Sequence, residues 1–251
     1  MFLRSVFLCA VSVLSAQTGE SVADLVAKTR EALKDRDTGR AEGERLLSQA
    51  LSQCRPARPV DNKACAEAAV LKGLFVLPQH GSTESARPEL ENAVRFYEAS
   101  GDDAGLALAL ETLAAIEAAA GHAPEAQSLR YRASVLRIRR IEQLASRDAA
   151  AKFIGNAIRI GPGVSPPQPE HKPEPSYTDD ARIAKYQGSV LVSIVIDADG
   201  SVRDVKLIRS LGFGLDESAY NAVRGWHFKP SMKDGEPVAV TANVELNFRL
   251  L

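Results

Sequence analysis

The last fifteen residues of the chain, PVAVTANVELNFRLL, carry the pattern that most constrains its fold. From Val238 to Leu250 every second residue is apolar, and the residues between them are mostly polar. Side chains alternate between the two faces of a strand, so this pattern predicts a strand with one buried face and one solvated face. Strands usually end after about five or six residues. The length of this one raises the question of which chain lies beside it.

The residues before this strand predict the partners of its apolar face. Residues 178–186 predict a short helix, and residues 187–210 predict a hairpin that turns at Asp199-Gly200. Apolar residues between Leu215 and Trp226 recur with the spacing of an amphipathic helix. A helix packed on one face of a small three-stranded antiparallel sheet would bury the apolar half of the terminal strand.

The first part of the chain predicts a different architecture. Residues 20–153 contain successive apolar patterns of helical period, rich in alanine. Within them, one stretch resembles a tetratricopeptide repeat, although Glu117 stands where that family usually has an aromatic residue. The matching positions are Leu110, Leu113, Ala114, Gly121, Ala126 and Ala133. We therefore expect a degenerate helical-repeat domain, with a plain helical bundle as the alternative.

These patterns divide the chain into four segments and predict the α+β class. Residues 1–16 have one positive charge, an apolar run and terminal small residues, which is typical of a cleaved secretory signal. An uncleaved membrane anchor is the alternative, although a spanning helix needs about 20 apolar residues. Residues 17–155 form the helical domain, 156–174 a proline-rich, extended linker, and 175–251 the small α/β domain.

The cysteines indicate the redox environment. Removal of the signal would leave Cys54 and Cys65, separated by a loop-like stretch with two prolines. In an exported protein such a pair most often forms a disulfide. Two unpaired thiols are the alternative.

The small α/β domain resembles the C-terminal domain of the TonB family, and the resemblance covers residues 174–250. The positions that carry it are Pro175-x-Tyr177, Ala181-Arg182, Gln187-Gly188, Val190-x-Val192, Asp199-Gly200, Gly214-Leu215-Asp216, Ala222-Val223-x-x-Trp226-x-Phe228-x-Pro230, Gly235-x-Pro237-Val238 and Phe248. In that family the domain is the periplasmic end of an energy transducer. It binds a short peptide of outer-membrane transporters, the TonB box, by strand addition to the edge of the last strand.

The resemblance implies a peptide-binding edge and a docking segment. We expect the edge to be formed by the outward row Thr241, Asn243, Glu245, Asn247 and Arg249. Pro175 and Tyr177 would form the segment that docks the receptor. The same edge would also allow two copies to pair as a homodimer.

Two departures from the best-known members of the family affect the expected partners. Those members have an N-terminal membrane helix that engages inner-membrane motor proteins, followed by a long proline-rich rod. Here a signal peptide and a helical domain stand in their place, which makes contact with the motor doubtful. Thr178 also stands where the family often has proline after the tyrosine.

Other classes of function lack support in the sequence. The net charge of −1 argues against binding to nucleic acid, which relies on a basic face. The four histidines have no metal-ligand spacing, and no nucleophile or phosphate-binding motif occurs. We therefore expect no enzyme, no cofactor and no metal site.

The sequence predicts a periplasmic TonB-like protein that binds a transporter's TonB box and supports energy-dependent transport. The alternative is a periplasmic scaffold whose helical repeats and dimerising TonB-like domain bind proteins without transducing energy. A chain anchored in the inner membrane by an uncleaved N-terminus is the other location that the sequence allows.

Overall fold

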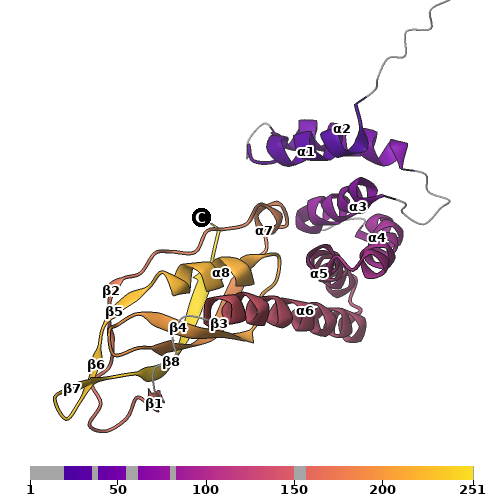
Figure 1. The fold of residues 1–251 in the computed structure, drawn as a ribbon. Helices are drawn as coiled ribbons and strands as arrows, with labels where there is room; N and C mark the ends of the chain where they lie inside the picture. The colour runs from indigo at the N-terminus through magenta and orange to yellow at the C-terminus, as the bar shows by residue number, and fades with distance from the viewer. Residues whose placement is uncertain (1–19, 36–38, 55–61, 80–82, 150–156, 251) are drawn as a thin grey trace, which may run out of the picture.

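The computed structural model describes residues 20–35, 39–54, 62–79, 83–149 and 157–250 (Figure 1). The expected signal peptide, residues 1–16, lies outside the described residues. None of the helices in the described ranges combines the length and the apolar character that a membrane-crossing helix needs. The chain has an all-helical N-terminal part and a strand-rich C-terminal part, which confirms the predicted α+β class.

The helices of the N-terminal part pack in pairs that follow chain order (Figure 1). The contacts join α1 to α2, α3 to α4, and α5 to α6, and α4 to α5 links the last two pairs. The elements are α1 (Val22–Ala32), α2 (Gly39–Gln53), α3 (Lys63–Val76), η1 (Leu77–Gln79), η2 (Thr83–Ala86), α4 (Arg87–Ser100), α5 (Asp103–Ala119) and α6 (Ala123–Ala149).

Local capping residues explain where several of these helices begin. Ser21 and Asp24 form a reciprocal capping box at the start of α1. Asn62 accepts a hydrogen bond from the backbone N–H of Cys65 at the start of α3, and Asp102 does the same for Gly105 in α5.

The residues with tetratricopeptide spacing lie at the interface of α5 and α6. Leu110, Leu113 and Ala114 are buried on α5, and Ala126 and Ala133 are buried on α6. Small side chains at such positions let two helices approach closely. Gly121 adopts a φ of +84° in the turn between the helices, a conformation that favours glycine. The assignment to the repeat family stays a prediction.

The buried Glu117 has an ionic environment in place of the expected aromatic one. Its carboxylate contacts the Arg87 guanidinium and lies 2.7 Å from His122 Nδ1. A charged group at this depth requires such partners. The departure from the repeat pattern is therefore compensated by side chains from α4 and the α5–α6 turn.

The C-terminal part is built on a sheet with strand order β1-β8-β3-β4. The strands β8, β3 and β4 are antiparallel, as the sequence predicts, and the two-residue β1 adds to β8 in parallel. The elements are β1 (Ile158–Arg159), β2 (Gln168–His171), α7 (Asp179–Ile183), β3 (Gly188–Ile196), β4 (Val202–Arg209), α8 (Leu215–Arg224), β5 (His227–Lys229), β6 (Ser231–Lys233), β7 (Glu236–Val238) and β8 (Val240–Phe248).

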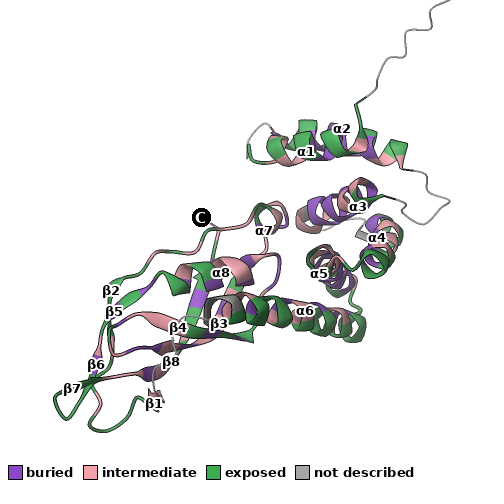
Figure 2. Ribbon diagram, in the orientation of Figure 1, coloured by how far each residue is buried: buried purple, intermediate pink, exposed green. Residues whose placement is uncertain are grey.

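The terminal strand has the two faces that its alternation predicts (Figure 2). Val240, Leu246 and Phe248 are buried in the same core as the buried stripe of α8, which runs from Leu215 to Val223. The strand is shorter than the alternating stretch, because Val238 belongs to β7, which pairs with β6. The apolar face therefore supplies core contacts to the domain.

The proline-rich segment lies against the C-terminal domain. β1 pairs with β8, Ser165 donates its backbone N–H to Met232 O at 2.9 Å, and β2 pairs with β5. The indole N–H of Trp226 then donates to Pro173 O at 3.0 Å. We expected a spacer between two domains, but backbone hydrogen bonds hold most of this segment on the second one.

The two parts of the chain are in direct contact. Helix α6 packs against β4 and α8, and α3 contacts α7. An ion pair between Arg30 of α1 and Asp180 of α7 crosses the same boundary. The helical part and the strand-rich part therefore form a continuous core.

Candidate functional site

The outer edge of β8 is the first candidate site, and one hydrogen bond fixes its orientation. Ile158 of β1 donates its N–H to Ala239 O at 2.9 Å. Backbone groups of alternate residues point to the same side of a strand. The β3–β8 register continues without a shift from Val240 to Phe248. The N–H groups of the odd-numbered residues from Thr241 to Asn247 therefore point away from β3.

This backbone direction coincides with the predicted peptide-binding row. Thr241, Asn243, Glu245 and Asn247 present their backbone groups to the outer edge, and Arg249 follows the end of the strand. Their side chains lie on the solvated face, where Thr241 is partly buried and the others are exposed. Beyond Thr241, no strand in the described part of the chain pairs with this edge.

One member of the row belongs to a polar cluster across the sheet. Ser189 Oγ of β3 donates to Glu245 Oε1 at 2.6 Å, and Arg209 of β4 contacts the same oxygen. The hydrogen bond from Ser189, followed by the bond and charge of Arg209, lowers the pKa of Glu245. Glu245 is thereby held ionised on the open face beside the edge.

The predicted docking segment lies at the C-terminal end of the same strand. The Tyr177 ring packs edge-on against Phe248 with a centroid distance of 5.8 Å, and its hydroxyl donates to Tyr186 O. Pro175 is half-buried two residues earlier. Thr178 caps α7 by accepting from Ala181 N at 3.3 Å, and it donates to Phe213 O. The structure thus places Tyr177 at the C-terminal end of the strand whose outer edge carries the predicted row.

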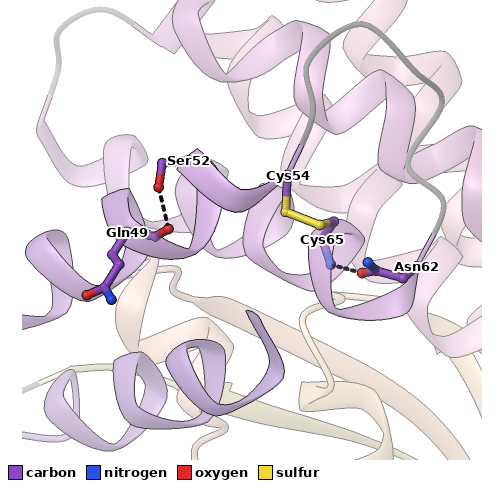
Figure 3. Close-up of a disulfide and its surroundings, with 5 residues drawn as sticks. All are labelled: Gln49, Ser52, Cys54, Asn62 and Cys65. Atoms are coloured by element: carbon purple, nitrogen blue, oxygen red, sulfur yellow. Dashed lines mark hydrogen bonds between the residues drawn. A yellow bond between two sulfur atoms is a disulfide. The ribbon is translucent and has the colours of Figure 1, made fainter. Parts of the chain in front are cut away.

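The two remaining cysteines lie away from this edge, at the junction of α2 and α3 (Figure 3). A disulfide joins Cys54 to Cys65, with Cα atoms 5.8 Å apart. Asn62 caps α3 beside it by accepting from Cys65 N at 2.8 Å. The disulfide links the end of α2 to the start of α3.

Sequence reasoning missed two sets of residues. Ile158 and Arg159 occupy the start of the β8 edge, and a two-residue strand has no detectable period. Glu111 and Arg137 form a buried ion pair where α5 and α6 meet the C-terminal part. A carboxylate within the apolar run of α5 was the available signal for that pair. Arg137 is buried although it lies in a basic stretch of α6, residues 130–140.

The described residues contain no cluster of three or more His, Cys, Asp or Glu side chains that could hold a metal ion. The polar groups of the candidate site are instead backbone amides and carbonyls along one strand edge. Such an edge binds another extended chain.

Comparisons with known proteins agree with this geometry. The family described as Gram-negative bacterial TonB protein C-terminal matches residues 173–250. Protein TonB of Vibrio cholerae is 36% identical over 78 residues, which cover 31% of this chain and 32% of the relative. Protein TonB of Xanthomonas campestris pv. campestris is 35% identical over 77 residues, covering 30% and 34%. Protein tonB2 of Pseudomonas aeruginosa is 30% identical over 81 residues, covering 32% and 30%.

The chain spans about a third of the length of these relatives, and the matched part is the strand-rich domain. The family match covers β3 to β8 with α7 and α8, including the whole candidate edge. Residues 173–250 are therefore a domain of the TonB C-terminal family.

Proposed function

We propose that this protein is a periplasmic, TonB-like binding protein rather than an enzyme. Its C-terminal domain binds the TonB box of an outer-membrane transporter by strand addition along the outer edge of β8, and so supports energy-dependent transport. The similarity of residues 173–250 to TonB proteins supports the class of partner. The orientation of the β8 backbone supports the mode of binding.

The single observation that carries the proposal is the pairing of β1 with this edge. Ile158 and Arg159 lie beside Val240 and Thr241 in parallel register. The edge therefore already accepts an added strand from the same chain. From Asn243 to Asn247 the outward N–H and C=O groups continue the same ladder, and a peptide would satisfy them.

β1 limits where such a peptide binds. A peptide confined to Asn243–Arg249 fits without displacing Ile158 and Arg159. A longer peptide that reaches Thr241 has to replace the β1 hydrogen bonds with its own. β1 thus sets the register of the bound peptide at one end of the site.

The helical part has the second role in this proposal, as a scaffold for a further partner protein. Stacked helical hairpins of the tetratricopeptide type bind peptides on a concave face. Contact with inner-membrane motor proteins would involve the N-terminal segment, and residues 1–19 lie outside the described ranges. The rival proposal is an adaptor in which two β8 edges pair and no energy is transduced.

A titration of residues 17–251 tests the main proposal. Isotope-labelled protein covering residues 17–251 receives unlabelled TonB-box peptide, and backbone amide shifts are recorded. We expect saturable shifts concentrated at residues 241–249. Absence of shifts at millimolar peptide would contradict peptide binding. A concentration-dependent dimer whose edge amides are already protected would support the adaptor instead.

A further inference from the structure

A cavity of about 480 Å³ lies between the two parts of the chain, at the end of β8. The helical part contributes residues of α1, the start of α2, and Phe75 of α3. The C-terminal part contributes α7, Gln187 and Leu250. The cavity therefore exists only because the helical part packs on the C-terminal domain.

The lining of this cavity contains more basic than acidic side chains, and Lys34 among them pairs with Glu31 at 2.7 Å. Five basic side chains face two acidic ones, Asp35 and Asp179, while Leu33, Phe75 and Ile183 provide apolar surface. The basic residues are Arg30, Lys34, Arg40, Arg182 and Lys185. An excess of positive charge over an apolar floor suits an anionic group on an organic chain.

Some of these cations are held in place by the protein. The Arg40 guanidinium lies 4.3 Å from the centre of the Phe75 ring, and its Nη2 donates to Phe75 O at 3.2 Å. Arg30 pairs with Asp180 across the two parts. These contacts fix the positions of two cations at the cavity, which reduces the ordering that a ligand would require.

Lys185 is placed at the cavity by an unusual backbone conformation. It follows the last turn of α7 with a φ of +50°, in the left-handed region that L side chains rarely adopt. Its N–H donates to Arg182 O at 3.1 Å, and Tyr186 N donates to Ala181 O at 2.9 Å. Glycine is the usual residue at this helix-ending position. The chain has a lysine there, and that lysine lines the cavity.

The cavity lies at the C-terminal end of β8. Leu250 and Gln187 line it, and Leu250 N donates to Gln187 Oε1 at 3.1 Å. Leu250 follows Phe248, the last residue of β8, by two positions. An extended peptide advances about 3.3 Å per residue. A peptide that pairs with β8 and continues past Arg249 would extend beyond the same end of the strand.

We propose that the cavity binds an acidic segment at one end of the peptide that pairs with β8. This inference rests on the proposed function, and it adds a reason why the protein would prefer some peptides over others. The helical part supplies Arg30, Lys34 and Arg40, and it lies outside the residues that match TonB proteins. The preference for a peptide with an acidic segment then depends on the helical part and the C-terminal domain together.

Binding of three peptides to the full chain tests this inference. Each contains the same TonB-box core; one has Glu-Glu-Glu at its N-terminus, one has it at its C-terminus, and one has Gln-Gln-Gln. We expect one of the two acidic peptides to bind about fivefold or more tightly than the glutamine peptide at low salt. The end at which the glutamates increase the affinity shows the direction in which the peptide runs along β8.

Matched variants locate the effect. Lys185→Gln and Lys34→Gln should each remove part of the preference for the acidic peptide, whereas Lys206→Gln, exposed on β4, should retain it. Lys185→Gly should also lose preference while its midpoint of thermal unfolding stays the same or rises, because glycine suits the left-handed backbone. That variant separates loss of charge from loss of fold.

The outcomes distinguish this inference from the proposed function. One outcome is that the glutamate and glutamine peptides bind with equal affinity while both shift the amides of residues 241–249. That result would overturn the proposed role of the cavity and leave the proposal of strand addition intact. An equal loss of preference in Lys206→Gln indicates unspecific attraction and also overturns it. Absence of binding by all three peptides overturns both proposals.

Discussion

The carboxylate of Glu111 accepts a hydrogen bond from the backbone N–H of Phe213 at 2.7 Å, although the two residues are 102 positions apart. Arg137 holds the same carboxylate through two hydrogen bonds of 2.8 and 2.9 Å. Its third nitrogen donates to Glu217 of α8 at 2.9 Å. A buried ionic group of three side chains thus joins the helical part to the TonB-like domain.

Replacing Arg137 with methionine should strongly destabilise the protein. Glu111 and Glu217 would lose their cation in a buried setting, and loss of one partner of a buried ion pair costs about 3–5 kcal/mol. Arg132→Met is the matched control, because its pair with Glu98 is nearly half exposed and contributes about 1 kcal/mol or less. Urea unfolding measures the loss of stability in each of the two variants. Equal losses in the two variants would contradict a linking role for Arg137.

Asp216 should make the stability of the protein fall as pH rises. Burial, only partly opposed by hydrogen bonds from Ser210 and Leu211, raises the pKa of Asp216 to about 6 from an ordinary 3.8. The folded state therefore binds a proton that the unfolded state releases between these values. Its stabilisation is full below about pH 4 and is lost as pH rises through about 6, by up to about 3 kcal/mol.

The variant Asp216→Asn isolates this contribution. It lowers stability at every pH by disturbing the hydrogen bonds from Leu211 and Gly212, but its amide does not titrate. The difference in unfolding free energy between wild type and variant should therefore change between pH 4 and 7. A constant difference across that range would contradict the raised pKa.

Proline at two neighbouring positions of β8 should have opposite consequences. Asn243→Pro removes an N–H that points away from β3, so folding persists while peptide binding is lost. Val244→Pro removes an N–H that points to β3 and should cost about 3 kcal/mol or more of stability. Thermal unfolding and peptide titration on both variants test the strand orientation. Similar destabilisation by the two prolines would show that the assigned orientation is wrong.

Releasing β1 should favour long peptides. Ile158→Pro removes the N–H that donates to Ala239 O, which frees the edge at Ala239 and Thr241. Affinity for a peptide long enough to pair with Thr241 should rise about fivefold, the equivalent of one net hydrogen bond. A peptide limited to Asn243–Arg249 serves as the control and should bind unchanged. A lower affinity for both peptides would mean that β1 supports the site.

Removal of the disulfide should destabilise the helical part. The bond between Cys54 and Cys65 closes a loop with a sequence separation of 11, and a loop of that size stabilises by about 3 kcal/mol in the chain-entropy account. The double variant Cys54→Ser, Cys65→Ser should lose about that amount in urea unfolding. The difference in unfolding free energy between oxidised and reduced wild-type protein gives a second measure of the same contribution. Peptide binding to β8 should be retained, since the crosslink lies between α2 and α3.

The sequence by itself determined the elements whose signals are local. Alternation over Val238–Leu250 predicted the two faces of β8, and helical spacing from Leu215 predicted α8. The hairpin predicted the antiparallel pairing of β3 with β4, and the place of β8 beside β3 is seen only in the structure. These patterns depend on residues close in the chain, where backbone periodicity alone decides which side chains meet.

Only the tertiary structure decided the features that join distant segments. The placement of β1 on the β8 edge, the contact of Glu111 with Phe213, and the cation-lined cavity each depend on how the helical part and the TonB-like domain pack. Short strands and single buried charges have no periodic signal. Their energies depend on partners brought close by folding, because a hydrogen bond or ion pair requires atoms within about 3 Å.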